Sequence, residues 1–300
     1  MKDYLVRATA GEGQILAIAA QTTLLVQEAK DLHNTSPTAT AALGRVLTGA
    51  ALMAATLKEG QSITVRILGD GPLGSIVAVA RTGTVKGYVA EPGVDLPLRH
   101  DGKLDVGRAV GRGMMYVAKD LGLKEPYNGS VPLVSGEIGE DLAYYFTASE
   151  QKPSAVGLGV LVEPGGKVGA AGGYLLQLLP GSAEGTAATL EKNIEAAGPV
   201  SRLISRGHTP EDILALLLQG FALKVHERRP LHYACDCSRE RLKDILLALG
   251  PGELQKLLEE QGGAEARCAF CSRTYRFSRE EVAELLAALP GQENHDPPEL

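Results

Sequence analysis

The pattern of apolar and polar residues changes along the chain. As far as about residue 179, short runs that alternate between apolar and polar residues are separated by turns rich in Gly, Pro and Asp, which predicts strands. The predicted strands are 3–10, 14–20, 62–68, 75–80, 84–90, 114–118, 129–134, 156–162 and 173–179. Helices are predicted over 22–33, 36–57 and 138–147, and the second of these begins with Ser36 as N-cap and Pro37 in the first turn. Many strands with few helices favour an α+β fold.

Beyond the turn at Pro180-Gly181-Ser182 the pattern becomes helical. Helices are predicted over 187–197 and 200–205. A third helix begins at Thr209-Pro210, where a cap and a proline precede two acidic residues. Its following segment, 213–223, is apolar nearly all round, so it is expected to be buried or available to a partner.

The last quarter of the chain predicts three short amphipathic helices. They cover 238–249, a stretch around 254–258, and a segment that opens with a capping box of Ser278 and Glu281. The predicted organisation is an α+β core domain over 1–179, a helical linker over 180–231, a small, mainly helical zinc-binding domain over 232–290, and a disordered tail over 291–300.

The four cysteines form one constellation. Cys235 and Cys237 are separated by one residue, thirty residues follow, and Cys268 and Cys271 are separated by two. Zinc prefers four tetrahedral ligands, and thiolates suit it. The spacer is longer than in most zinc ribbons, but it contains two predicted helices that bring the second pair back to the first. The spacing therefore predicts one zinc ion held by four thiolates.

This zinc site is either purely structural or a redox switch. A disulfide across a single residue closes a cramped ring and is comparatively oxidising. Nearby arginines and a helix N-terminus favour the reactive thiolate. These arginines are Arg239, Arg241, Arg267, Arg273 and Arg276. A domain of about sixty residues is marginal without its ion, since zinc supplies about 10–16 kcal/mol and typical domain stability is about 5–15 kcal/mol.

Composition narrows the class of protein. The net charge of −6 disfavours nucleic acid as a partner. The N-terminus lacks the apolar region of a signal peptide, and the most apolar stretch, 39–57, contains Arg45 and is too polar to span a membrane. We therefore expect a cytoplasmic protein without a membrane partner, whose clustered cysteines are metal ligands or redox sensors rather than permanent disulfides.

The sequence predicts no enzyme. The G-x-G-x-x-G match at Gly69–Gly74 contains Pro72 and precedes a predicted strand, so a hairpin turn explains it better than a dinucleotide site. Glu137, Glu140 and Asp141 fit a solvated helix face. His232 is a weaker alternative zinc ligand, because four cysteines already complete the site.

Several motifs resemble the bacterial 33 kDa chaperonin family of redox-regulated chaperones, and the resemblance spans nearly the whole chain. They are C-D-C-S-R-E-R from Cys235, C-A-F-C from Cys268, VRILGDGPLG from Val65, YYFTASEQKPSAVGLGVLV from Tyr144 and GGYLLQLLPG from Gly172.

The resemblance implies a holdase rather than an enzyme, largely inactive while reduced and zinc-bound. Oxidation by peroxide with heat, or by hypochlorous acid, would form the disulfides Cys235–Cys237 and Cys268–Cys271 and expel zinc. The zinc domain and linker would unfold, apolar surface would bind unfolding client proteins during oxidative stress, and the activated chain would form a homodimer. Reduction would reverse these changes.

The residues add a candidate client site to this expectation. Ile213, Leu217 and Phe221 lie directly before the zinc domain, and we expect them to bind clients together with the N-terminal sheet surface. Two rival interpretations stay open: a protein or nucleic-acid adaptor with a purely structural Cys₄ zinc, and an enzyme whose active site lies unrecognised in the N-terminal domain.

Overall fold

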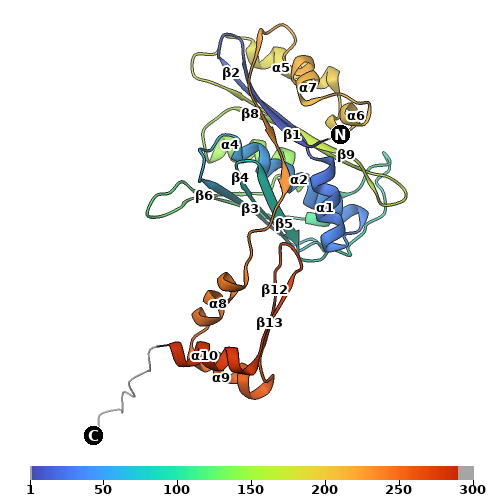
Figure 1. Cartoon of the computed structure of the whole chain (residues 1–300). Helices are drawn as coiled ribbons and strands as arrows, with labels where there is room; N and C mark the ends of the chain where they lie inside the picture. The colour runs from blue at the N-terminus through green and yellow to red at the C-terminus, as the bar shows by residue number, and fades with distance from the viewer. Residues whose placement is uncertain (1, 290–300) are drawn as a thin grey trace, which may run out of the picture. The chain divides into compact units, whose positions relative to one another are not determined.

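The computed structural model describes residues 2–289, so the predicted disordered tail over 291–300 lies outside the described residues. The chain divides into two compact units, Met1–Ala234 and Cys235–Leu300, which we call the N-terminal and C-terminal units. Figure 1 labels most of their helices and strands. The predicted α+β fold is confirmed. The finer division into a core, a linker and a zinc domain stays a prediction.

Two sheets form the N-terminal unit. Sheet A has the order β10-β1-β2-β9-β8 and is antiparallel throughout, whereas sheet B has the order β11-β5-β4-β3-β6-β7 with one parallel pair, β11 and β5. Sheet A comprises β10 (Leu223–Pro230), β1 (Tyr4–Ala10), β2 (Ile15–Gln21), β9 (Val168–Leu178) and β8 (Ser154–Val162). Sheet B comprises β11 (His232–Tyr233), β5 (Thr84–Val89), β4 (Ser75–Arg81), β3 (Ser62–Gly69), β6 (Gly113–Asp120) and β7 (Tyr127–Pro132). The turn between β3 and β4 contains the Gly69–Gly74 motif, as predicted.

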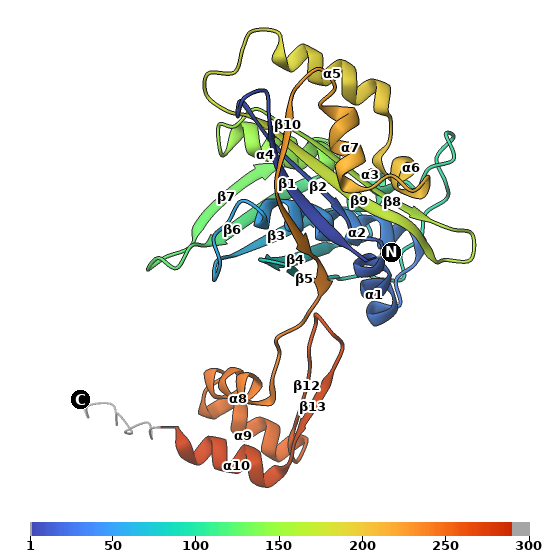
Figure 2. The ribbon, with the colours of Figure 1, turned by 45° about the horizontal axis from the view of Figure 1, so that its top comes forward.

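Helix α2 (Pro37–Ala54) lies between the two sheets and is the centre of the core (Figure 2). From Thr38 to Ala54 every residue of α2 except Arg45 is buried. Its start is the predicted one, since Ser36 accepts a hydrogen bond from the Ala39 N–H at 3.3 Å and Pro37 follows. Two further helices, α1 (Thr23–His33) and α4 (Gly139–Ala148), pack beside it, and α3 (Val106–Val110) is short.

Close packing around α2 depends on Gly44. A Cβ at this position would lie 2.7 Å from Val26 of α1 and 2.8 Å from Val160 of β8. No real side chain tolerates such contacts, so any larger residue would push α2 away from α1 and sheet A. The long helix and sheet A therefore meet directly.

The other face of sheet A is covered by three helices, α5 (Thr186–Ala197), α6 (Val200–Ser205) and α7 (Pro210–Leu217) (Figure 2). The N-terminal unit is therefore layered as sheet B, α2 with its neighbours, sheet A, and these three helices. The apolar core on this outer face is separate from the core around α2.

One element of the predicted helical linker is wrong. Residues 180–231 contain α5, α6 and α7, but Leu223–Pro230 forms strand β10, paired antiparallel with β1 at the edge of sheet A. Edge strands carry charged residues and proline, which discourage further pairing. The sequence LKVHERRP therefore lacks the apolar alternation by which the other strands were predicted.

The last residues of the N-terminal unit, Tyr233 and Ala234, are bound to its core. In β11, Tyr233 is buried in the core around α2, donates to the Gly87 carbonyl oxygen at 2.8 Å and accepts from the Gly87 N–H at 3.3 Å. The Ala234 N–H then donates to the carbonyl oxygen of Val85 at 3.0 Å. Cys235 is the next residue of the chain.

Between residues 235 and 289, the C-terminal unit has three helices and one hairpin. They are α8 (Arg239–Ala248), α9 (Pro251–Glu260), α10 (Arg279–Ala288), β12 (Ala264–Arg267) and β13 (Thr274–Phe277). The buried core is small and consists of Leu246, Leu254, Leu258, Ala264, Phe277 and Val282. Within residues 2–289, no helix is both long enough and apolar enough to cross a membrane.

Candidate functional site: a four-cysteine centre and a covered apolar face

The four cysteines lie at two structured positions of the C-terminal unit. Cys235 and Cys237 come immediately before α8, whose N-cap Ser238 accepts from the Arg241 N–H at 3.2 Å. Cys268 and Cys271 lie at the tip of the β12–β13 hairpin. There the Ser272 N–H donates to the Cys268 carbonyl oxygen at 2.9 Å, and Ser272 takes a left-handed φ of 58° that turns the chain back.

The geometry brings all four sulfurs together, as the spacing predicted. Cys235 Sγ lies 3.7 Å from Cys268 Sγ, Cys237 Sγ lies 3.3 Å from Cys271 Sγ, and all four are within 4.8 Å of one another. In a tetrahedral site with zinc–sulfur bonds of about 2.3 Å, sulfurs are about 3.8 Å apart. The thiols are free and much farther apart than the roughly 2.05 Å of a disulfide. The residues therefore fit a tetrahedral metal ion.

The set of candidate ligands consists of cysteines alone. Among residues 2–289, Cys235, Cys237, Cys268 and Cys271 are the one group of metal-ligating side chains that converges in this way. His232, the weaker alternative, is not a member of it. Thiolate sulfur is a soft donor that suits zinc over magnesium or calcium.

The surroundings of Cys235, Cys237 and Cys271 shift the pKa values of their thiols in different directions. Burial raises the pKa of Cys235 to about 12 and also raises the pKa of Cys271. Burial acts in the same direction on Cys237, but hydrogen bonds from Tyr275 and from neighbouring thiols outweigh it and lower the pKa of Cys237 to about 7. Cys237 therefore carries thiolate character near neutral pH, while Cys235 and Cys271 keep their protons.

Most of the arginines expected to activate the thiols have other partners. Arg241 pairs with Asp236 at 3.1 Å and Arg276 with Glu265 at 2.7 Å. Carboxylates neutralise these cations, so the expectation that they favour thiolates is wrong for them. The side chain missed by sequence reasoning is Tyr275, whose hydroxyl lies 3.2 Å from Cys237 Sγ. An aromatic hydroxyl four residues after the last cysteine was its one sequence signal.

Arg239 connects two helices of the same unit. Its guanidinium binds both carboxylate oxygens of Glu281 at 2.7 and 2.8 Å and lies 4.4 Å from the centre of the Phe277 ring. Glu281 also completes the capping box of α10 with Ser278. Arg239 thus joins the start of α8, just after Cys237, to the start of α10.

The predicted client residues lie against sheet A in the N-terminal unit. Ile213 and Leu217 are buried and Phe221 is partly buried, all in the apolar cluster on the outer face of the sheet. We call the sheet side of this cluster the covered face. The covered face consists of Val6, Ala8, Ala10, Ile15, Ala17, Ala19, Ala170, Tyr174 and Leu176.

Few polar contacts fasten α7 over the covered face. Glu211, in its first turn, accepts from the Tyr4 hydroxyl at 2.7 Å and is also paired with Arg228. At its other end, Asn193 of α5 donates to the carbonyl oxygens of Leu217 and Gln219 at 3.1 and 2.9 Å. Leu216 points outward and is 40% exposed. Apolar packing therefore supplies most of the attachment.

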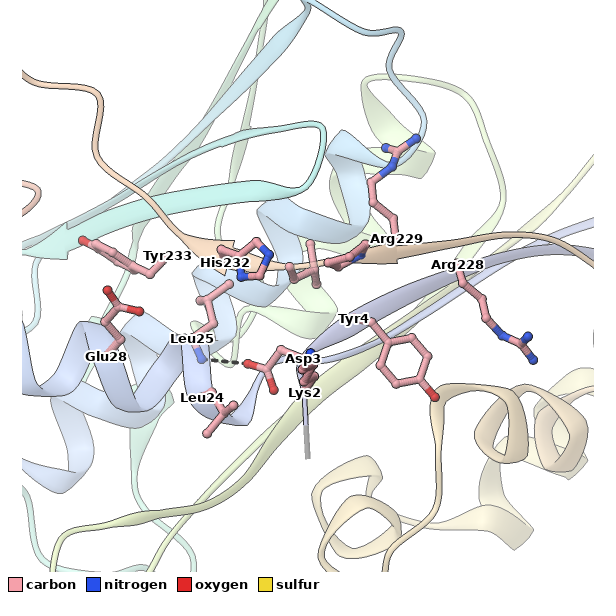
Figure 3. Close-up of a pocket in the computed structure, with 12 residues that line it drawn as sticks. Lys2, Asp3, Tyr4, Leu24, Leu25, Glu28, Arg228, Arg229, His232 and Tyr233 are labelled. Atoms are coloured by element: carbon pink, nitrogen blue, oxygen red, sulfur yellow. Dashed lines mark hydrogen bonds between the residues drawn. The ribbon is translucent and has the colours of Figure 1, made fainter.

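A groove of about 620 Å³ opens where β1, β10 and α1 meet (Figure 3). Its buried acid is Asp3, whose carboxylate accepts from the Leu25 N–H at 2.7 Å; burial raises the pKa of Asp3. Thr22 makes no side-chain cap for α1, so Asp3 supplies that cap from a neighbouring strand. The raised pKa therefore has a structural explanation.

Comparison with known proteins gives one consistent family. The sequence model described as Hsp33 protein matches residues 3–278. The 33 kDa chaperonin of Desulforamulus reducens is 50% identical over 95% of this chain and 98% of its own, and that of Symbiobacterium thermophilum is 53% identical over 95% and 97%. The crystal structure of the 33 kDa chaperonin (heat shock protein 33 homolog) of Thermotoga maritima superposes with a TM-score of 0.89 at 40% identity, covering 96% of this chain and 98% of that one.

The metal centre predicts proton release on metal binding. A free Cys with a pKa of about 8.5 is protonated at pH 7, and burial in the folded unit raises the pKa of Cys235 and Cys271 further. Zinc added to the metal-free, reduced chain at pH 7 therefore releases at least those two protons. Calorimetry in buffers of different ionisation enthalpy measures the number. The same titration restores the helical circular dichroism of the C-terminal unit. Serine at all four positions abolishes both signals, and a variant of that kind with a folded C-terminal unit contradicts the prediction.

The Glu211 contacts predict a pH-dependent attachment of α7. Burial acts to raise the pKa of Glu211, but the hydrogen bonds from Tyr4 and Arg228 outweigh it and lower the pKa below its usual 4.5. The stabilisation is therefore complete above pH 4.5 and is lost as the pH falls through the lowered value. Glu211→Gln weakens the attachment by about 1 kcal/mol at pH 7, measured by hydrogen exchange of the α7 amides.

The control for this prediction is Glu191→Gln on the exposed side of α5. It leaves exchange of the α7 amides unchanged at pH 7. Equal exchange in wild type and Glu211→Gln at pH 7 would show that the contacts with Tyr4 and Arg228 do not stabilise α7.

Proposed function

The chain belongs to the Hsp33 protein family, a family of chaperones, and we propose that it is a redox-regulated holdase of the cytoplasm. The observation that carries the proposal is the convergence of Cys235, Cys237, Cys268 and Cys271 within 4.8 Å in a unit with a very small core. A reducing compartment keeps such thiols available for a metal. An oxidant is then the signal, because it converts these thiols into disulfides that no longer bind the metal.

The metal of the reduced state is zinc in this proposal. When bound, zinc neutralises four thiolates and links the start of α8 to the β12–β13 hairpin. Six buried residues make up the remaining core, which is little for a unit of this size. A structural zinc contributes about 10–16 kcal/mol, so the fold of the C-terminal unit depends on intact thiolates.

Oxidation consumes the ligands in a balanced reaction. A cysteine thiolate attacks one oxygen of hydrogen peroxide, the O–O bond breaks, and a sulfenic acid and hydroxide result. A neighbouring thiolate attacks the sulfenic sulfur, forms the disulfide and releases a second hydroxide. Each disulfide therefore takes two electrons from two sulfurs and reduces one peroxide. Two peroxides suffice for all four cysteines.

The proposed disulfides are Cys235–Cys237 and Cys268–Cys271. In the reduced geometry the closest sulfurs belong to different pairs, 235 with 268 and 237 with 271. However, only one or two residues separate the cysteines of each proposed pair. Their sulfurs therefore stay close to each other even when the C-terminal unit unfolds, and this favours local bonds. A disulfide across one residue is strained and easily reduced, as a reversible switch requires.

Activation then uncovers apolar surface in the N-terminal unit. The chain runs from α7 through β10 and β11 directly to Cys235, so disorder that starts at the cysteines reaches the helices over sheet A along the backbone. Loss of α7 exposes Ile213, Leu217 and the covered face to unfolding clients. Such an apolar surface also supports the homodimer that we propose for the oxidised chain.

The redox proposal predicts linked changes on treatment with peroxide at elevated temperature. Free thiols fall from four to none, zinc is released, and aggregation of an unfolding client is suppressed; a thiol reductant reverses all three. A thiol titration, a chromogenic zinc chelator, light scattering of the client and size-exclusion chromatography measure them in parallel. Peptide mapping under acid quench identifies the disulfides. Zinc release without client protection would instead support a purely structural zinc in an adaptor protein.

The covered face predicts opposite effects of Leu217→Gln in the two redox states. Because Leu217 is 1% exposed, a polar side chain there weakens the attachment of α7 by about 2–4 kcal/mol. Client protection by the reduced protein therefore rises, whereas the fully oxidised protein protects less because its apolar surface is smaller. Adding Phe221→Gln enlarges the second effect.

Leu216→Gln is the matched control, since Leu216 lies on the exposed side of the same helix. It leaves the reduced protein inactive. If Leu217→Gln with Phe221→Gln stays folded and keeps full oxidised activity, then α7 is not part of the client site.

A further inference from the structure

The hydroxyl group of Tyr275 lies within hydrogen-bond distance of one of the four sulfurs. Its Oη lies 3.2 Å from Cys237 Sγ and 3.2 Å from the carbonyl oxygen of Cys237. Arg273, two residues earlier, donates from Nη1 to the same Oη at 3.5 Å. Tyr275 lies in β13, next to the hairpin tip that carries Cys271, so a single strand fixes both the hydroxyl and a neighbouring ligand.

The hydroxyl has one proton and two acceptors. Arg273 can only donate, so it occupies a lone pair of Oη and polarises the O–H bond. The proton goes to either the sulfur or the carbonyl oxygen of Cys237. A metal-bound or free thiolate carries negative charge and strengthens a hydrogen bond to it, whereas a disulfide sulfur carries none. The direction of the proton therefore depends on the redox state of Cys237.

We propose that Tyr275, polarised by Arg273, is a positioning residue that protects Cys237 from oxidation by donating a hydrogen bond to its sulfur in the metal-bound state. The proposal rests on the redox switch described above. A metal-bound sulfur is already deprotonated, so in that state the hydrogen bond creates no further thiolate. It withdraws the electron density that the Cys237 sulfur needs to attack the peroxide oxygen. Hydrogen bonds to ligand sulfur also orient the ligand and strengthen metal binding.

The Tyr275 hydroxyl distinguishes Cys237 from Cys235, its neighbour in the first cysteine pair. Cys235 and Cys237 precede a helix, but the Tyr275 hydroxyl contacts Cys237. Oxidation of Cys237 removes the charge that holds the proton, which then moves to the carbonyl oxygen of Cys237 without moving the ring. Tyr275 thus stabilises the reduced, metal-bound form selectively and sets the oxidant level at which the switch responds.

The test is Tyr275→Phe in the full-length, zinc-loaded chain. This variant removes one oxygen and keeps the ring that packs on the core of the C-terminal unit. We expect zinc affinity, measured without oxidant by chelator competition, to fall about 10-fold to 100-fold. Thiol oxidation by peroxide becomes roughly tenfold faster, because the Cys237 sulfur has lost its hydrogen bond from the hydroxyl. Tyr144→Phe, an exposed tyrosine of α4, changes neither.

A spectroscopic readout separates this role from simple packing. In the cobalt(II)-substituted protein, Tyr275→Phe shifts the sulfur-to-cobalt charge-transfer bands, because one sulfur loses its hydrogen bond. Arg273→Gln shifts them in the same direction by less, and has a smaller effect in the Tyr275→Phe background because its path to the sulfur is gone. Unchanged bands, zinc affinity and oxidation rate in Tyr275→Phe would overturn the proposal.

The experiment also distinguishes its own failure from that of the redox switch. Zinc affinity and the cobalt spectrum are measured without oxidant, so they test Tyr275 even if peroxide never activates the chain. Conversely, oxidation could give client protection in the wild-type chain and in Tyr275→Phe alike, with equal zinc affinity and oxidation rate. That result would support the redox switch and contradict the role of Tyr275.

Discussion

In the proposed function, the C-terminal unit depends on the attraction between a cation and four converging sulfurs. Four thiolates within 4.8 Å of one another would repel, so all four sulfurs can be deprotonated together only around a cation, and the small apolar core adds little stability of its own. On this proposal the unit stays folded only while its ligands remain chemically intact. Oxidation of a pair of sulfurs by two electrons would then unfold the C-terminal unit.

The N-terminal unit is built on the opposite principle. Helix α2 is buried along almost its whole length between two sheets, so its stability does not rest on any single contact. Only the outer layer, α5 to α7, is attached to sheet A by a modest apolar cluster and the contacts of Glu211 and Asn193. This arrangement suits the proposed function, in which the outer layer would leave a stable scaffold and expose apolar surface.

Local signals in the sequence predicted much of this structure. The cap at Ser36 and Pro37 located α2, and short cysteine spacings located the metal centre, because both depend on neighbouring residues. Strand β10 was missed because its charges and terminal Pro230 belong to an edge, and its place is fixed by pairing with distant β1. Tyr275 was missed because its sulfur partner is 38 residues away. The expectation for Arg241 and Arg276 failed because their carboxylate partners appear only in the fold.

Tyr233 lies two residues before Cys235 and is locked to Gly87 by two hydrogen bonds inside the main core. If unfolding starts at the cysteines, as proposed, this anchor is a barrier to its spread towards α7. Breaking it takes thermal energy that oxidation at the sulfurs does not provide. In the proposed mechanism, oxidation of the cysteines would therefore prepare the response and warmth would release it.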